Sequence, residues 1–140
     1  MATSKASATW EGTLKNGRGT MKPAHGAPLP FSAGTRFEGE PGSNPEELIG
    51  AALAGCFSMA LSVGLEKAGV RAASIRTSAS VKLERQGDGF EITAIDLATE
   101  VSAPGLDAAK LKELAETTKK TCPVSKALAV RTVTVEARLA

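Results

Sequence analysis

The fold of this chain is decided by residues 48–65, LIGAALAGCFSMALSVGL, which carry no charged side chain over 18 positions. An α-helix of that length measures about 27 Å, near the lower limit for crossing a membrane. Many of these residues are Gly, Ala or Ser, and the chain supplies no belt of Trp or Tyr to flank a span. The pattern therefore predicts a helix buried on nearly all sides in a soluble protein, with a second subunit covering part of it.

The residues that flank this stretch predict where the helix begins and ends. Asn44 is a favourable N-cap, and Pro45 fits the first helical position because no amide hydrogen is needed there. Glu47 stands where a capping box requires an acidic side chain. Gly69 suits the left-handed turn that ends many helices. We therefore expect one long helix between Pro45 and Gly69.

After the helix, apolar residues recur at every second position. Residues 75–83 and residues 95–101 alternate apolar with polar side chains, and Asp88-Gly89 between them is typical of a hairpin turn. Residues 133–139 alternate in the same way. The first two segments predict an antiparallel hairpin that buries one face, and the third predicts the last strand.

Two shorter helices are expected between the hairpin and the last strand. Asp107 is a favourable N-cap for a helix whose apolar stripe includes Leu111 and Ala115. The dipeptide Cys122-Pro123 then begins a short third helix, because Pro is favoured at a first helical position.

The N-terminal segment mixes strand and loop signals. Residues 7–24 predict a hairpin that turns at Asn16-Gly17. Residues 25–34 are rich in Gly and Pro and predict a loop, and residues 35–38 predict a short strand. The order of all the elements predicts a single α+β domain over residues 1–140, with mainly antiparallel sheets packed around the long helix.

Composition excludes several classes of protein. The 140 residues carry a net charge of only +2, and aromatic residues make up 4%, which argues against a nucleic-acid-binding surface. Two cysteines are too few for a disulfide scaffold. Residues 1–10 contain no apolar run like that of a secretory signal. We therefore expect a cytoplasmic protein that binds neither nucleic acid nor membrane.

The two cysteines are the first candidates for chemistry. Cys56 and Cys122 lie 66 positions apart, so they form no CxxC motif, and with a single histidine in the chain we expect no metal site and no cofactor. Taken alone, Cys56 is most simply a small buried hydrophobic residue. Cys122 stands where a helix begins, and amide dipoles there favour a reactive thiolate.

Two charged residues flank the start of the long helix. Taken alone, Arg36 is most simply a solvated strand residue, and Glu46 a first-turn carboxylate that the helix dipole favours. Neither position identifies a function by itself.

Four motifs together are specific. Residues 35–39 (TRFEG), 44–52 (NPEELIGAA), 55–61 (GCFSMAL) and 121–125 (TCPVS) closely resemble the motifs of the osmotically inducible protein C (OsmC/Ohr) family of thiol peroxidases. The resemblance covers nearly the whole chain. Because Arg36 stands just before the helix, the sequence is more similar to the osmotically inducible branch than to the organic hydroperoxide resistance branch.

The resemblance implies a peroxidase of the oxidative and osmotic stress response that prefers organic hydroperoxides to hydrogen peroxide. Cys56 would be oxidised to a sulfenic acid, and Cys122 would resolve it as a Cys56–Cys122 disulfide. A dithiol reductant would regenerate both thiols. Arg36 would hold Cys56 as the thiolate, and Glu46 would orient Arg36. The family fold is an intertwined homodimer with its sites at the interface.

Helix geometry makes such a dimer physically sensible. Glu46 and Cys56 are ten residues apart on one helix, about 15 Å along its axis, so they cannot share a pocket within one chain. If two long helices pack antiparallel across a two-fold axis, Arg36 and Glu46 of one subunit approach Cys56 of the other. The Gly- and Ala-rich helix would also line an oily pocket for alkyl peroxides.

Two alternatives stay open at this point. The first is a dimeric module that binds a lipid or another small molecule and does no chemistry. The second is a thiol-based redox sensor that signals without turnover. From helix position alone, Cys122 is also the better thiolate, whereas the resemblance assigns the attack to Cys56.

Overall fold

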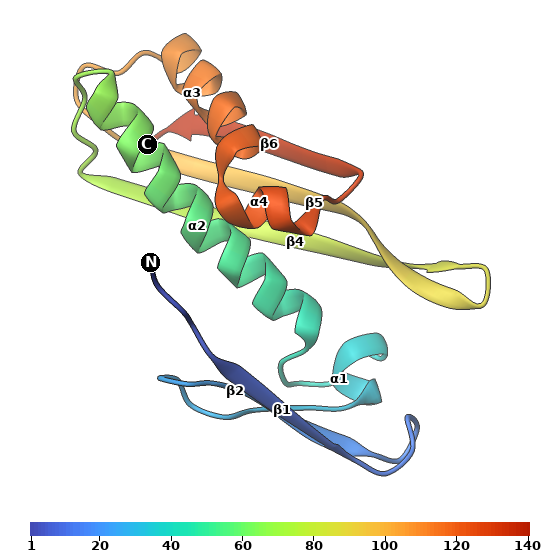
Figure 1. Ribbon diagram of the computed structural model, residues 1–140. Coiled ribbons are helices and arrows are strands. Elements are labelled where there is room, and N and C mark those ends of the chain that lie inside the picture. Colours follow the sequence, from blue (N-terminus) through green and yellow to red (C-terminus); the bar gives the residue numbers. More distant parts are fainter. The chain divides into compact units, whose positions relative to one another are not determined.

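The computed structural model describes residues 1–140 and divides into two compact units, residues Met1–Leu48 and Ile49–Ala140. Each unit contains one three-stranded sheet, and the long helix α2 (Pro45–Lys67) begins in the first unit and continues through the second (Figure 1). The α+β class, the antiparallel sheets and the single long helix are confirmed. The expectation of one domain over the whole chain stays a prediction.

The sheet of the first unit is a small antiparallel meander. Its strands are β1 (Ala6–Glu11), β2 (Arg18–Pro23) and β3 (Leu29–Phe31), paired in that order. The hairpin is confirmed, but its connection is a six-residue loop over residues 12–17 rather than a two-residue turn. Strand β3 lies in the segment that we expected to be a loop, because three residues are too few to show an alternating pattern.

The expected strand over residues 35–38 is wrong, because these residues belong to helix α1 (Ala33–Phe37) and its C-cap. The cause is a capping box in which the Ser32 hydroxyl accepts from the amide of Thr35 at 3.2 Å. The Thr35 hydroxyl in turn accepts from the amide of Ser32 at 3.0 Å. Such reciprocal bonds satisfy the free donors of a helix start, so even a five-residue helix is well defined here.

Helix α2 begins and ends as the sequence predicts. The Asn44 side chain accepts from the amide of Glu47 at 2.9 Å, and Pro45 is the first helical residue. At the other end Gly69 adopts a φ of 78°, and the amide of Val70 bonds back to Leu65. Both ends are therefore capped by local hydrogen bonds.

Within one chain, only one face of α2 is buried, and the expectation that a second subunit covers part of the helix stays a prediction. Leu53, Phe57, Leu61 and Leu65 are fully buried, whereas the side chain of Met59 is 75% exposed. The helix is long and apolar enough to cross a membrane, and 28% of its most apolar window is buried. The many small residues of this helix therefore do not make its hydropathy weak, as we took them to do when we excluded a span.

The sheet of the second unit is built from β4 (Ser74–Gln86), β5 (Gly89–Ser102) and β6 (Thr132–Leu139). Strands β4 and β5 form the expected antiparallel hairpin, whose turn is Gly87-Asp88, one residue earlier than predicted. Strand β6 runs parallel to β5, which the alternation pattern did not indicate. The parallel pairing requires a crossover, and the chain supplies it with two helices.

The crossover consists of α3 (Ala108–Thr121) and α4 (Pro123–Leu128), both where the sequence predicts helices. Helices α2, α3 and α4 cover one face of the β4–β5–β6 sheet (Figure 1). At Gly50, a Cβ would lie 3.3 Å from Val81 of β4, so a small residue lets helix and sheet approach. The hydrophobic core lies between these layers and consists of the buried residues Leu53, Phe57, Leu61, Leu65, Ile95, Leu97, Val101, Leu106, Leu111, Ala115 and Cys122.

Candidate active site

The two cysteines meet in the core of the second unit. The thiol of Cys122 donates to the sulfur of Cys56, with the Sγ atoms 3.0 Å apart, and both cysteines are free. Cys56 lies midway along α2 and is partly exposed, whereas Cys122 is fully buried between α3 and α4. A small movement would bring the two sulfurs to the distance of a disulfide. The pair is therefore placed to form a disulfide within one chain, with loss of two electrons and two protons to an oxidant.

Cys122 is held by the junction of two helices. Its backbone amide bonds to Thr118 at 2.9 Å, which ends α3, and its carbonyl accepts from Lys126 at 3.0 Å, which begins α4. The hydroxyl of Ser125 bonds to the carbonyl of Lys119 at 2.7 Å and ties the two helices together. Because both sides of the junction are hydrogen-bonded, the thiol has little freedom to leave its position.

The environment of Cys122 corrects a prediction made from its place at a helix start. Burial raises the pKa of the Cys122 thiol above 9.0, and the hydrogen bond to Cys56 raises it further. Hydrogen bonds from the amides of Ser125 and Val124 act in the opposite direction without cancelling this effect. Cys122 is therefore a thiol at neutral pH, and the helix start does not make it the better nucleophile.

A chain of buried hydroxyl groups connects α2 to the sheet near Cys56. The Ser58 hydroxyl lies 2.8 Å from the carbonyl of Ala54 and 2.8 Å from the hydroxyl of Thr77, which lies 2.9 Å from that of Thr99. A carbonyl can only accept, so the Ser58 hydroxyl is the donor to Ala54, and it is also the donor toward Thr77; either hydroxyl of Thr77 and Thr99 can donate to the other. The sequence analysis missed this chain, although Thr77 occupies an apolar position of the strand alternation.

The first unit contains an ion pair between Arg36 and Glu46. Arg36, in the last turn of α1, donates from Nε to both Glu46 oxygens at 3.2 Å and from Nη2 to Oε1 at 2.6 Å. The Glu46 residue is 7% exposed, and about a third (34%) of the Arg36 side chain is exposed. A carboxylate so deeply buried requires a charged partner, and the forked geometry fixes the direction of the guanidinium.

Two further contacts position Arg36. Its guanidinium carbon lies 5.2 Å from the centre of the Phe37 ring, within the range of a cation–π interaction. The side-chain amide of Asn44 bonds to the carbonyl of Thr35 at 3.2 Å, so the N-cap of α2 also holds α1. Arg36 is thus placed by a helix and its cap, not by the strand that we expected.

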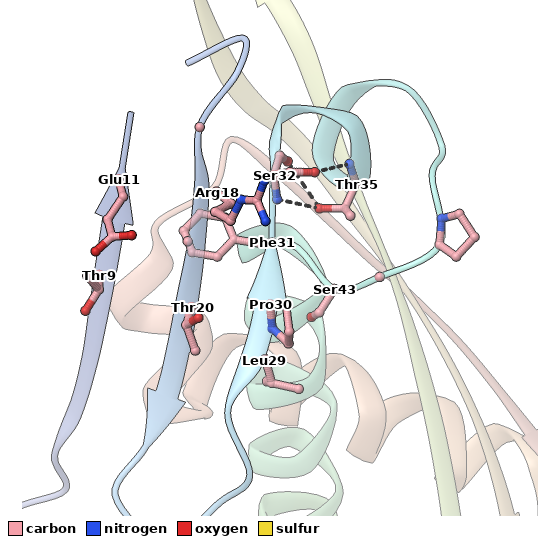
Figure 2. A pocket seen from close by; sticks show the side chains of 14 residues that line it. Thr9, Glu11, Arg18, Thr20, Leu29, Pro30, Phe31, Ser32, Thr35 and Ser43 are labelled. Atoms are coloured by element: carbon pink, nitrogen blue, oxygen red, sulfur yellow. Dashed lines mark hydrogen bonds between the residues drawn. The ribbon is translucent and has the colours of Figure 1, made fainter. Parts of the chain in front are cut away.

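Two of the hollows on the first unit are lined in part by residues 32–36. One, of about 300 Å³, opens beside Arg36, and its wall includes Trp10 and Phe31, whose ring centres are 5.3 Å apart. The remaining lining residues are Leu14, Ser32, Ala33 and Phe37. The other, of about 750 Å³, lies over the three strands and the residues before α2, and Figure 2 shows Arg18, Thr20, Phe31 and Ser43 at its walls.

Each pair of predicted site residues is therefore assembled within one unit. Arg36 meets Glu46 in the first unit, and Cys56 meets Cys122 in the second. The dimer interface that would bring the two pairs together stays a prediction.

Comparisons with known proteins show the family of this chain. The family described as OsmC-like protein matches residues 37–138. The chain is 49% identical over 126 residues to a protein named Peroxiredoxin OsmC in Escherichia coli (strain K12) and in Shigella flexneri, covering 89% of this chain and 88% of each relative.

Solved structures have the same fold. The organic hydroperoxide resistance protein OhrB of Bacillus subtilis superposes with a TM-score of 0.68 at 26% identity, covering 97% of this chain and 98% of that one. An OsmC-like protein of unknown function from Vibrio cholerae gives a TM-score of 0.76 at 18% identity, covering 98% of this chain and 99% of that one. This second likeness concerns the fold alone.

Proposed function

This chain belongs to the OsmC-like protein family and is a peroxidase-type enzyme, and we propose that it reduces organic hydroperoxides to alcohols through Cys56 and Cys122. The observation that carries the proposal is the 3.0 Å contact between the two sulfurs. The name of the Bacillus subtilis protein, organic hydroperoxide resistance, supports the choice of an organic substrate over hydrogen peroxide.

In the first step, the Cys56 thiolate attacks the outer oxygen of the peroxide. The O–O bond breaks, the sulfur is oxidised to a sulfenic acid, and the alkoxide takes a proton to leave as an alcohol. Cys56 suits this step because it is partly exposed, whereas Cys122 is fully buried. A peroxide can therefore reach the sulfur of Cys56 but not that of Cys122.

In the second step, Cys122 attacks the sulfenic acid of Cys56. The S–S bond forms, the S–O bond breaks, and the hydroxide leaves as water with the thiol proton of Cys122. Burial keeps the pKa of Cys122 high, so this proton is still present when the sulfenic acid forms. An external dithiol then returns both cysteines to the thiol state and leaves as its own disulfide.

Arg36 is the group that we expect to stabilise negative charge on the sulfur and on the peroxide oxygens. Its donors form a planar fork, and Glu46 fixes the orientation of that fork from one side. A fixed cation of this kind stabilises charge that develops in a transition state without reorganising. Glu46 acts through Arg36, so it is a positioning residue.

We further propose that the enzyme is a homodimer in which Arg36 of one chain serves Cys56 of the other. Glu46 and Cys56 are ten positions apart in α2, about 15 Å of helix rise. In addition, no apolar side chain of residues 1–48 is buried, and one face of α2 is uncovered. A second copy of the chain would cover both surfaces and complete the site.

The apolar hollow beside Arg36 is the proposed seat of the alkyl group. Trp10, Leu14, Phe31 and Phe37 provide its apolar wall, and Arg36 provides a single charged donor. Such a wall favours a substrate with a hydrocarbon tail, because burial of that tail lowers the free energy of binding. Hydrogen peroxide has no such tail and is the weaker substrate.

The central test is intact-mass analysis after addition of one equivalent of cumene hydroperoxide. We expect a loss of two hydrogens per chain, no change in Cys56→Ser, and the gain of one oxygen in Cys122→Ser. With a dithiol present, the unmodified protein turns over repeatedly, which a redox sensor or a binding module would not do. If Cys122→Ser fails to react at all, the roles of the cysteines are reversed.

The dimer is tested by mixing two inactive variants, Arg36→Gln and Cys56→Ser. If Arg36 acts on the partner's sulfur, each mixed dimer contains one complete site, and random exchange restores about a quarter of the original activity. If Arg36 acts within its own chain, no site is complete and no activity returns. A monomer that keeps full activity at high dilution would also contradict the proposal.

We place this chemistry in the cytoplasm. Both cysteines are free thiols in the structure, and a reducing compartment is needed to return them to that state after each cycle. Fractionation of the expressing cell is the direct check.

A further inference from the structure

The two sulfurs of the pair differ in their access to a reductant. Cys122 is 0% exposed and belongs to the hydrophobic core, whereas Cys56 is partly exposed at the edge of that core. A thiolate attacks a disulfide from the side opposite to the bond that breaks, so the attacked sulfur needs an open approach. Attack on Cys122 would require the reductant to enter between α3, α4 and the sheet.

Two backbone amides partly offset the cost of leaving Cys122 as a thiolate in a buried position. The amides of Val124 and Ser125 donate to it, and the bond from the Ser125 hydroxyl to Lys119 holds the turn that carries them. Two of the influences that raise the pKa of Cys122, its hydrogen bond to Cys56 and the charge of Cys56, depend on Cys56 being free. Both disappear when Cys56 is bonded to the reductant. The burial that raises the pKa of Cys122 most remains, and so do the two amides that lower it.

We propose that the dithiol reductant attacks the Cys56 sulfur of the oxidised enzyme, and that Cys122 leaves as a thiolate held by the amides of Val124 and Ser125. This inference rests on the proposed function, in which the Cys56–Cys122 disulfide is the oxidised state. It specifies which sulfur the reductant attacks when the oxidised enzyme is reduced.

Reduction of the disulfide takes place in two thiol–disulfide exchange steps. The reductant thiolate forms a bond to Cys56 Sγ, the Cys56–Cys122 bond breaks, and the electron pair goes to Cys122 Sγ. The second thiol of the reductant then attacks its own bound sulfur and releases Cys56 as a thiolate. The reductant leaves as a disulfide, Cys122 takes up a proton, and Cys56 is released in the form that reacts with the next peroxide.

The same geometry gives dithiols an advantage over monothiols. Once Cys122 has left, its sulfur remains close to Cys56, since the reduced pair lies only 3.0 Å apart. It can attack the mixed disulfide and expel a monothiol, which reverses the step. A dithiol escapes this reversal because its second sulfur is tethered at a high effective concentration.

The test uses the full-length protein oxidised with diamide, so that it does not depend on peroxide turnover. Loss of two hydrogens confirms the disulfide, and 2-mercaptoethanol is then added and quenched with acid at a series of early times. After alkylation of free thiols in denaturant, peptide mass analysis locates the mercaptoethanol. We expect it on Cys56, with the alkyl group on Cys122, in about a tenfold excess or more at the earliest time.

Three results would overturn the inference. These are an adduct that appears first on Cys122, an equal distribution between the two sulfurs, and a failure of diamide to form the disulfide. A protein that gives the expected adduct but consumes no cumene hydroperoxide would contradict the proposed function alone. The two claims can therefore fail separately.

Discussion

The two compact units of this chain differ in what they bury. Every buried hydrophobic residue lies in the second unit, between its helices and its sheet, whereas the only buried residue of the first unit is the charged Glu46. The second unit is stabilised by a core and places two sulfurs in it. The first unit has no such core and presents an oriented guanidinium. The charge and the sulfurs therefore come from parts of the chain that differ in how much apolar surface they bury.

The largest expected effect is the stabilisation of the second unit by oxidation. The Cys56–Cys122 disulfide would close a loop of 66 residues that lies within that unit. By the loop-entropy relation, closing such a loop in the unfolded chain stabilises the folded state by about 4 kcal/mol. We expect diamide to raise the free energy of unfolding by about this amount. Urea titration of oxidised and reduced protein measures it.

The control for this prediction is Cys122→Ser, which should show no difference between oxidised and reduced samples. Hydrogen exchange gives a sharper comparison. The added protection should lie in residues 49–140, so an equal gain over residues 1–48 would show that the two units do not unfold separately.

The next largest effect is expected at Arg36. Replacement of Arg36 by Gln removes the charge that we expect to act on Cys56, so the rate of sulfenic acid formation should fall about 100-fold. It also leaves buried Glu46 without a partner, which costs stability, about 3 kcal/mol for a buried pair. Stopped-flow oxidation by cumene hydroperoxide and urea unfolding measure the two losses.

The double variant Arg36→Gln/Glu46→Gln separates these two effects. Removal of the buried charge should restore much of the lost stability and none of the lost rate. If the rate also returns, Arg36 serves only to balance Glu46, and the first unit supplies no chemistry.

A smaller effect is expected from the buried hydroxyl chain. Thr77→Val keeps the shape of the side chain but leaves Ser58 and Thr99 without one partner each, which should cost about 1–2 kcal/mol in unfolding free energy. Thr134→Val is the matched control on an exposed strand, where the bond to Asp96 is solvated. Equal losses of unfolding free energy in the two variants would show that the hydroxyl chain does not specify the packing of α2 on the sheet.

The smallest effect is the pH dependence that Cys122 confers on the reduced protein. Its pKa is raised in the folded state, so the folded thiol keeps its proton at a pH where the unfolded thiol loses it. This contribution is complete below 9.0 and is lost as the pH rises through the folded pKa. Urea titrations between about pH 8 and about pH 10 should show a shallower decline in Cys122→Ala than in the parent protein.

Much of the fold could be predicted because its signals are local. The caps of α2 and α3 are set by Asn44 and Asp107, whose side chains bond to amides three residues ahead. The strand alternation of β4 and β5 follows from one buried face. Such features depend on near neighbours, which a sequence displays directly.

The features that could not be predicted depend on distant residues or on competing local signals. The parallel pairing of β6 with β5 leaves no mark on the alternation of either strand. At α1, the bonds between Ser32 and Thr35 prevailed over the weak strand signal of residues 35–38. The high pKa of Cys122 arises from burial by the core, which its position before Pro123 does not reveal.

The parallel crossover also determines when the chain can acquire its chemistry. Cys122 lies in the connection between β5 and β6, so the second sulfur reaches the first only after about nine-tenths of the chain has been synthesised and the last strand has found its neighbour. A growing polypeptide therefore carries a single thiol, that of Cys56, over about half of its length, until residue 122 has been added. The order of the elements thus makes the Cys56–Cys122 bond a late event in the life of the chain.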